Sequence, residues 1–469
     1  MLAFFPGGDL KRLACCMIWA AAILPAQDDL SVRYRDASRR IIDAALQSDA
    51  GLDRLAYLCD RIGHRVSGSK ALDNAIAWSA AEMKRAGLQN VRAIPVMVPH
   101  WVRGEESAAM LLPLERPLAM LGLGDSVGTP PDGVSADVVR VGSFDEMAQL
   151  GRAGVAGKIV LFDVPYAGYG QTVPYRTNGP ARAAELGAAA VLVRSITPHS
   201  LRSPHTGVTV YPAGSPRIPG AAVAVEDAEM ITRLIQAGNR VRVRLKMQAH
   251  READSPSADV IGELPGAEKP DEVIVMGGHI DSWDVGQGAQ DDGSGIMAAL
   301  EAASVLQKLG LRPRRTIRVV FWTNEENGGA GGRGYRDWLG DKVKQHVAAI
   351  EMDGGAEKLV GFGLSMGGSG QRIPDAVMAA AAGIGKLLEP LDGSSMTAGF
   401  GGSDIEPLMA AGVPGFGLRT TGAHYFDWHH TQADTFDKID PAEFRKNAAA
   451  LAVLSYVLAD MPVKLEELK

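Results

Sequence analysis

The chain has 469 residues, which exceeds one average domain of about 100–200 residues and predicts two or three structural units. Its composition, 46% hydrophobic and 22% charged, is that of a folded globular protein and argues against a disordered chain. The net charge of -7 indicates no basic surface for a phosphate backbone. Nucleic acid is therefore not an expected partner.

Residues 1–26 have the layout of a secretory signal peptide. Lys11 and Arg12 precede an apolar run over residues 13–24, and the chain then becomes polar. This run is shorter than the roughly 20 residues that a membrane-spanning helix needs. We therefore expect export to a secreted, periplasmic or other extracytoplasmic location, without a membrane span.

The next unit, residues 27–120, is expected to form the N-terminal part of a larger domain. Residues 36–47 and 71–87 have apolar positions at helical spacing, and residues 90–98 are typical of a strand. The Pro- and Gly-rich stretch at 122–134 predicts a boundary.

Residues 121–250 predict a smaller α/β module. Short apolar segments at 158–162 and 189–193 are typical of strands, and a helix is expected between them at 180–186. The polar segment 251–258, which contains a proline, is expected to be a linker that leads back to the larger domain.

The last unit, residues 251–469, alternates more regularly. We expect strands over 272–276, 316–322 and 347–350, with helices over 293–309 and 334–339. This alternation predicts an α/β fold with a mostly parallel central sheet and helices on both faces. Ligands bind beyond the carboxyl ends of the strands in such sheets, so the chemistry should lie there.

Metal-ligand residue types follow the three predicted strands. His279 and Asp281 come after the first strand, Glu325 and Glu326 after the second, and Asp353 after the third. Zinc takes imidazole nitrogen and carboxylate oxygen, so this set suits zinc, and the lack of a cysteine cluster argues against a structural site.

Two further residues complete the pattern. Asp291 lies in an acidic loop that opens a helix, where a carboxylate can bridge two metals about 3.5–4 Å apart. His430 follows the last predicted strand. Taken singly, each motif has an ordinary explanation as a core His–Asp pair, a solvated Glu–Glu pair or an Asp–Gly turn. Their joint occurrence at one rim of one sheet favours a metal site.

The order of these motifs resembles a known family. The chain reads His-x-Asp, Gly-Ala-x-Asp-Asp, Glu-Glu, Asp-Gly and His-Thr-x-x-Asp-Thr, which is similar to the co-catalytic di-zinc aminopeptidases and glutamate carboxypeptidases. The resemblance covers nearly the whole mature chain, and the middle module resembles an inserted protease-associated domain. It implies a zinc-peptidase (phosphorylase/hydrolase-like) fold, two Zn²⁺ per chain, a peptide substrate and a homodimer.

The resemblance also implies roles for individual residues. The implied metal ligands are His279, Asp291, Glu326, Asp353 and His430. Asp291 then bridges the metals, Glu326 and His430 complete one site, and His279 and Asp353 complete the other. Glu325 becomes the general base, and Asp281 orients the His279 ring as an acceptor behind it. The family's Asp-Asp peptide, here Asp291-Asp292, is often cis.

Three details differ from the family pattern or leave a choice. The loop at 327–332 is glycine-rich where the family tends to place a larger apolar residue. His429 stands beside His430, and the Thr-x-x-Asp-Thr that follows sets the register on His430. Upstream, Tyr425 and His424 are candidates for holding a substrate carbonyl or oxyanion, although a packing role is equally compatible with an aromatic loop residue.

The expected function is an exopeptidase that hydrolyses dipeptides or short peptides through a metal-activated water. Two alternatives stay open: a catalytically silent receptor-like relative, and a single-zinc aminoacyl cyclase on the same fold. The complete set of ligands and base favours the enzyme. Whether the substrate is recognised by a free N-terminus, a free C-terminus or both is left open.

Overall fold

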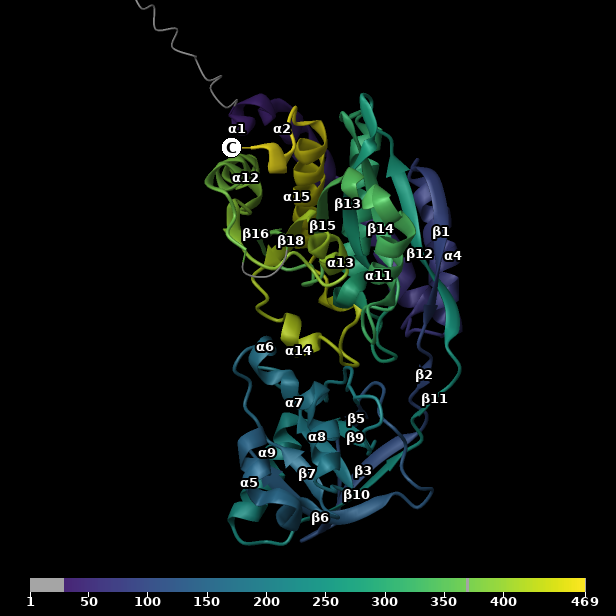
Figure 1. The fold of residues 1–469 in the computed structure, drawn as a ribbon, viewed down its shortest axis with the longest axis vertical. Helices are drawn as coiled ribbons and strands as arrows, with labels where there is room; N and C mark the ends of the chain where they lie inside the picture. The colour runs from purple at the N-terminus through teal and green to yellow at the C-terminus, as the bar shows by residue number, and fades with distance from the viewer. Residues whose placement is uncertain (1–28, 368–370, 469) are drawn as a thin grey trace, which may run out of the picture.

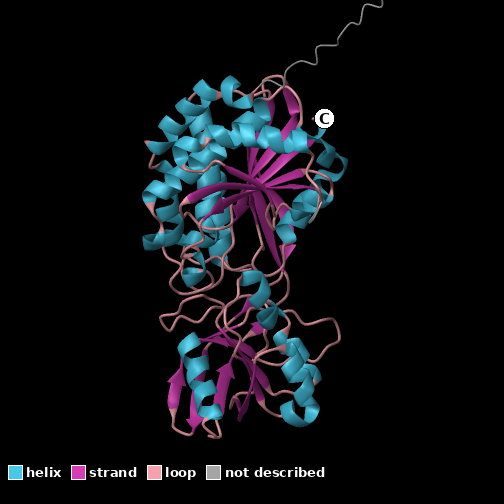
Figure 2. Ribbon diagram, turned by 90° about the vertical axis from the view of Figure 1, so that its left-hand side faces the viewer, coloured by secondary structure: helices cyan, strands magenta, loops and turns pink. Residues whose placement is uncertain are grey.

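The computed structural model describes residues 29–367 and 371–468, which form two bodies, each built around one large sheet (Figure 1). In the larger body the strands radiate as a twisted fan with helices on both sides (Figure 2). The smaller body lies at the other end of the long axis. The expected signal peptide at 1–26 lies outside the described residues. Within the described part, no helix is long and apolar enough to span a bilayer.

The larger sheet has parallel pairings at its centre. Its strand order is β1 (Gln89–Val98), β12 (Ser255–Leu264), β14 (Arg315–Trp322), β13 (Lys269–His279), β15 (His346–Glu351), β18 (Pro414–Thr420), β16 (Leu359–Met366) and β17 (Ser395–Ala398). The pairings β14–β13, β13–β15 and β15–β18 are parallel, whereas β1–β12, β12–β14 and β16–β18 are antiparallel. The expected α/β fold with helices on both faces is confirmed.

Alternate residues of β13 face opposite helix layers, as the two-residue period of a strand requires. The helices of this body are α1 (Leu30–Arg33), α2 (Arg35–Leu46), α3 (Ala50–Tyr57), α4 (Lys70–Arg85), α10 (Ser294–Lys308), α11 (Ala330–Leu339), α12 (Asp375–Leu387), α13 (Glu406–Ala410), α14 (Tyr425–Trp428) and α15 (Pro441–Asp460). Ile274 and Met276 join the core under α2, α3, α4, α10 and α15, whereas Val275 joins the core under α11 and α13.

The smaller body has its own sheet and cores on both faces of it. Its strand order is β4 (Arg116–Leu118), β3 (Glu106–Leu112), β10 (Arg242–Met247), β6 (Val134–Val141), β7 (Ile159–Phe162), β8 (Ala190–Arg194), β9 (Gly220–Val223) and β5 (Met120–Gly122). Its helices are α5 (Phe144–Val155), α6 (Tyr169–Thr172), α7 (Pro174–Thr177), α8 (Gly179–Glu185) and α9 (Val225–Gln236). Because β3 pairs antiparallel with β10, the strands of this body begin at Glu106, before residue 121.

Two chain segments join the bodies. A short pairing of β2 (Trp101–Val102) with β11 (His250–Arg251) ties the outgoing and returning segments together. The expected linker at 251–258 is wrong in its second half, because β12 starts at Ser255 and pairs with β1. Pro256 fits there because β14 pairs with β12 only from Val260 onward, so the proline removes no donor from that second ladder.

Candidate metal centre

The predicted site residues lie at one edge of the larger sheet. His279 is the last residue of β13 and stands opposite Trp322, the last residue of β14, while Gly277 stands opposite Glu351, the last residue of β15. Because these strands run in parallel, their carboxyl ends meet. The loops that follow carry Glu326 and Asp353 to the same place.

Asp291 lies between two histidines. Its Oδ1 is 3.1 Å from Nε2 of His279, and its Oδ2 is 3.3 Å from Nε2 of His430. On the outer sides, Glu326 Oε2 lies 3.0 Å from His430 Nε2, and Asp353 Oδ1 lies 3.6 Å from His279 Nε2. The structure thus brings together all five residues that the sequence predicts as ligands.

Two neighbours also offer ligand atoms. His429 Nε2 lies 3.6 Å from Asp291 Oδ2, and the His429 ring stacks on that of His430 at 3.5 Å. Asp292 groups with His279 and Asp353, although its Oδ2 already accepts the backbone N–H of His279 at 3.1 Å. The Asp291–Asp292 peptide bond is cis, as the family resemblance implies.

The electrostatics of the cluster fit a cation. Within the described residues, Asp291 Oδ2 and Asp353 Oδ1 are buried without a hydrogen-bond partner, which is costly for carboxylate oxygens that hold no ion. Burial, reinforced by the charge of Asp291, raises the pKa of Glu326 to about 7. Burial disfavours a charged His279, but the hydrogen bond to Asp291 and the negative charge of Asp353 raise the pKa of this ring well above its ordinary value. Buried imidazoles and carboxylates at these distances are a donor set that suits zinc.

Asp281 connects the ligands to the expected base. Its Oδ1 accepts the backbone N–H of Glu325 at 3.1 Å, and its Oδ2 accepts that of Glu326 at 3.4 Å. The nearest acceptor for Nδ1 of His279 is the carbonyl oxygen of Asp281 at 3.0 Å, while the carboxylate oxygen lies at 3.8 Å. Asp281 therefore acts on the ring mainly through its backbone and on the Glu325–Glu326 turn through its side chain.

The Glu325 carboxyl group belongs to the same acidic cluster. Burial raises its pKa to about 8; the charge of His279 opposes the shift, and those of Asp353 and Glu326 add to it. These are the influences expected on a carboxyl group that shares a confined space with metal-type ligands.

Two residues that were not predicted from the sequence hold the loops of the site in place. Asp434 accepts the backbone N–H of Asp291 at 3.2 Å, and it belongs to the His-Thr-x-x-Asp-Thr motif, which is the signal that could have found it. Arg65 is fully buried and donates to the carbonyl oxygens of Ile280 at 2.7 Å and Gly288 at 3.0 Å. No local pattern marks Arg65, because these partners are more than two hundred positions away.

The two candidate substrate residues lie in different surroundings. Tyr425 is buried at the start of α14, with its ring 5.2 Å from that of His429. Burial raises its pKa well above the ordinary value, and the charges of Asp291 and Asp353 add to this shift. His424 is exposed, and its side chain contacts Asp427, at 3.1 Å from Nδ1, and the ring of Trp428. Tyr425 thus lies close to the acidic cluster, whereas His424 is held on the surface.

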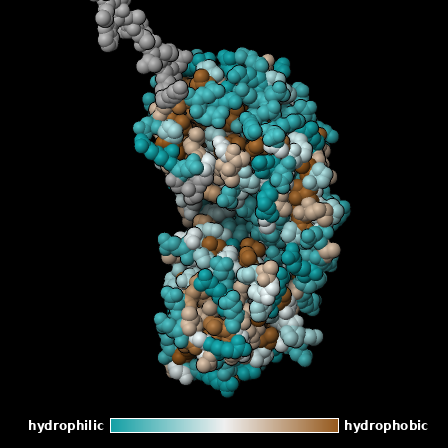
Figure 3. Space-filling model, in the orientation of Figure 1, coloured by the Kyte–Doolittle hydropathy of each residue, from teal (hydrophilic) through white to brown (hydrophobic). Residues whose placement is uncertain are grey.

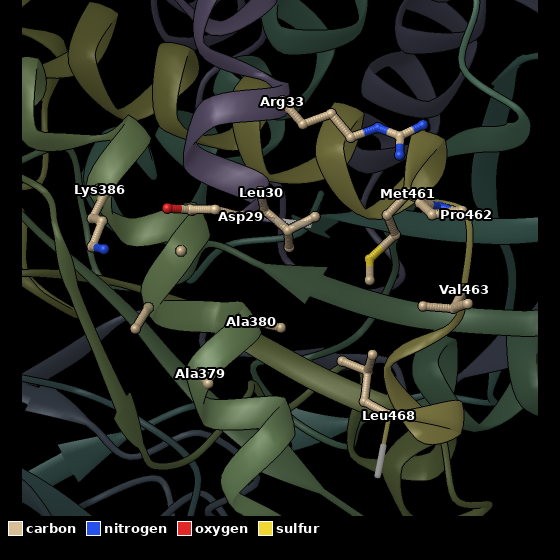
Figure 4. A pocket seen from close by; sticks show the side chains of 12 residues that line it. Asp29, Leu30, Arg33, Ala379, Ala380, Lys386, Met461, Pro462, Val463 and Leu468 are labelled. Carbon is tan, nitrogen blue, oxygen red and sulfur yellow. The ribbon is translucent and has the colours of Figure 1, made fainter. Parts of the chain in front are cut away.

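Open space borders the cluster. A cavity of about 110 Å³ is lined by Glu351, Asp353, Phe400 and Arg419, among others, and Figure 3 shows a recess between the two bodies on one side. A larger, mainly apolar cavity of about 430 Å³ lies elsewhere, between α1, α12 and the C-terminal segment (Figure 4). The larger cavity shares no lining residue with the predicted site.

Comparison with known proteins assigns the family. The profile of Peptidase family M28 matches residues 259–455. The chain is 42% identical over 432 residues to carboxypeptidase Q of Mus musculus, which covers 91% of this chain and 90% of that protein. The chain belongs to peptidase family M28. All five predicted ligands of this M28 chain fall inside the matched range.

Two solved structures share the fold of this chain. The structure of a Peptidase M28 precursor from Shewanella amazonensis SB2B matches with a TM-score of 0.89 at 34% identity, over 94% of this chain and 99% of that one. A zinc aminopeptidase from Bacillus subtilis matches with a TM-score of 0.63 at 19% identity, over 92% of this chain and 97% of that one, which shows a shared fold alone. The M28 fold of this chain thus includes both bodies.

Proposed function

We propose that this M28 chain is a zinc-dependent exopeptidase that hydrolyses dipeptides or short peptides with Glu325 as the general base. The observation that carries the proposal is the position of Asp291 between His279 and His430, with further acids on both outer sides. The identity to carboxypeptidase Q and the M28 membership support a metallo-exopeptidase.

The proposed site holds two zinc ions. Asp291 would serve both ions, because its Oδ1 faces His279 and its Oδ2 faces His430. His279 and Asp353 complete one site, and Glu326 and His430 complete the other. Zinc ions bound there lower the pKa of a water molecule towards neutrality and polarise the scissile carbonyl.

Residues of the chain then carry out the proton transfer. Glu325 is not needed as a ligand in this assignment, so its carboxylate can accept a proton from the attacking water and deliver it to the leaving amine. The hydrogen bond from its backbone N–H to Asp281 fixes the turn from which it projects. Asp281 also accepts the adjacent backbone N–H of Glu326. The general base Glu325 and the proposed ligand Glu326 are therefore held at a fixed distance from each other.

Substrate binding is proposed in the space beside Asp353. The cavity there is lined by Phe400 and Arg419, which suits an apolar side chain and an anionic group of a short peptide. Tyr425 is proposed to stabilise the oxyanion from its place near the acidic cluster, and the exposed His424 is kept as a candidate for holding a substrate carbonyl.

The organisation of the chain supports export and an inserted module. We propose that residues 1–26 are a signal peptide and that the mature protein acts outside the cytoplasm. Residues 27–120 and 251–469 then form the peptidase domain around residues 121–250, with β3 and β4 contributed to the inserted body. A homodimer is proposed from the family resemblance, and sedimentation of the purified protein measures it.

A dipeptide screen with metal analysis tests the function. The purified protein is expected to contain two zinc ions by elemental analysis, to cleave unblocked dipeptides and to lose this activity with a chelator. Peptides blocked at either end show which terminus is recognised. Two zinc ions without hydrolysis would support a catalytically silent relative. A single zinc ion with cyclisation of N-terminal glutamine would support the cyclase.

A further inference from the structure

The second ring nitrogen of His430 faces the inserted body. While Nε2 points at Asp291 and Glu326, Nδ1 lies 3.2 Å from the carbonyl oxygen of Thr206. The backbone N–H of Thr206 in turn donates to the carbonyl oxygen of His430 at 3.0 Å. One residue of the inserted body therefore contacts His430 from two sides.

Thr206 is itself held by three contacts. Its hydroxyl donates to the carbonyl oxygen of Gly122 at 2.7 Å and accepts from Nη2 of Arg103 at 3.3 Å. The Arg103 guanidinium forms a two-bond ion pair with Asp284, at 2.6 and 2.8 Å, in the loop that follows His279. Nη1 of Arg176 donates to the carbonyl oxygen of Thr206 at 3.3 Å. The position of this carbonyl is thus fixed from both bodies.

Aromatic side chains also pack between the inserted body and the metal site. Trp283 belongs to the loop after His279, yet its buried side chain joins the hydrophobic core of the inserted body, edge-on to Trp101. The Trp283 ring also contacts the ring of His430, with centroids 5.6 Å apart. From the other side, Tyr169 of α6 lies edge-on to His429 at 5.2 Å. His430 is therefore enclosed by groups whose places depend on the docking of the inserted body.

We infer that Thr206 is a positioning residue for the metal site, and that the inserted body holds His430 in its ligating orientation. A metal-bound histidine usually donates its other N–H to a carbonyl or carboxylate, which fixes the ring and its tautomer. For His430 this acceptor is the Thr206 carbonyl, 224 positions away in the chain. The inserted body thus contributes to the chemistry as well as to the fold, since the His430 side of the site is incomplete without it.

The inference rests on the proposed ligand assignment, and it is tested by metal affinity. Thr206→Val keeps the shape of the side chain but removes the hydroxyl that anchors the residue. The carbonyl behind His430 is then expected to shift, and metal binding to weaken towards the roughly 10- to 100-fold effect that loss of such an outer contact has. Titration of the metal-free protein with zinc against a chelator is expected to show one weakened site, with the His279 site unchanged.

Thr232→Val is the matched control. Thr232 is a buried threonine of the same body, and its hydroxyl donates to Asp163 at 2.6 Å, away from the metal site. This variant is expected to bind both ions as the parent does. The absorption spectrum of the cobalt-substituted protein should likewise change in Thr206→Val but not in Thr232→Val, because it reports ligand orientation.

Arg176→Met provides a second variant whose direction of effect decides between two roles. If Arg176 helps to position the carbonyl of Thr206, its removal weakens zinc binding at the His430 side. If the guanidinium acts only as a charge 3.4 Å from Nδ1 of His430, its removal strengthens zinc binding. Unchanged affinity in Thr206→Val, or tighter binding in Arg176→Met, would overturn the inference. A parent protein that binds no zinc would instead refute the proposed function.

Discussion

The side chain of Asp281 accepts the backbone N–H of Glu325 at 3.1 Å. This contact links the loop after β13 to the loop after β14. Because the carbonyl oxygen of the same Asp281 lies 3.0 Å from Nδ1 of His279, one residue sets the position of a predicted ligand and of the predicted base together. The site is therefore a connected unit, and its residues should respond differently to substitution.

Replacement of the base should separate chemistry from metal binding. Glu325→Ala is expected to keep both zinc ions and to lose about 10²- to 10⁴-fold in kcat/KM, the usual contribution of a positioned proton acceptor. Elemental analysis and dipeptide hydrolysis measure the two effects. If Glu325→Ala cleaves dipeptides as fast as the parent, the assignment of the base is wrong.

Replacement of the neighbouring Glu326 should instead lower zinc binding and activity together. Glu326→Ala removes the carboxylate that lies 3.0 Å from His430 Nε2, so zinc binding at that side is expected to fall along with activity. Excess zinc should recover part of the activity of Glu326→Ala but none of that of Glu325→Ala. Full zinc occupancy of Glu326→Ala under chelator competition would contradict the ligand assignment.

Asp281→Asn tests the link between the two loops. The amide keeps one oxygen for a backbone N–H but presents a donor to the other, so either Glu325 or Glu326 loses its acceptor. We expect kcat to fall at least about 10-fold. Asp271→Asn, at an exposed position of β13, is the control. Unchanged kcat in Asp281→Asn would show that the turn holds its shape without this contact.

Zinc should also stabilise the folded chain. A ligand that binds only the folded state adds about 2.7 kcal/mol at a free concentration one hundred times its dissociation constant. Removal of zinc by a chelator should therefore lower the melting temperature of the parent, and added zinc should restore it. In a variant that lacks both His279 and His430, the chelator is expected to change nothing. An equal chelator effect in that variant would place the stabilising ions elsewhere.

A buried histidine remote from the site should make stability depend on pH. Burial, together with the charge of Arg318, lowers the pKa of His346 to about 3. The unfolded chain, with an ordinary histidine pKa of about 6.5, then binds a proton that the folded chain does not. Stability is present above pH 6.5 and falls as the pH drops below it, by about 2 kcal/mol at pH 5 from this residue.

His346→Gln removes this contribution. The difference in unfolding free energy between pH 7 and pH 5 is expected to be smaller in the variant than in the parent, as measured by denaturant unfolding. His250→Gln, at an exposed histidine, serves as the control. An equal pH dependence in His346→Gln and the parent would contradict this role of His346.

Much of the fold could be predicted from the sequence, because its central strands are mainly apolar. Residues 273–276 and 319–322 are apolar and buried on both faces, so their composition indicates strands without knowledge of their neighbours. The segment 251–258 could not be assigned in this way. Its residues 255–258 begin β12, where among the described strands only β1 pairs with them. Positions paired on one side have little apolar signal.

By itself, the sequence determined the order and types of the site residues: a histidine or carboxylates follow each central strand, and parallel strands must bring their carboxyl ends together. Tertiary structure alone decided what stands behind those residues. Thr206 contacts His430 through its backbone carbonyl, and the Arg65 side chain donates to backbone carbonyls more than two hundred positions away. A backbone carbonyl is the same group in every residue. Such contacts leave no mark on residue identity, so only the folded arrangement shows that the inserted body reaches His430.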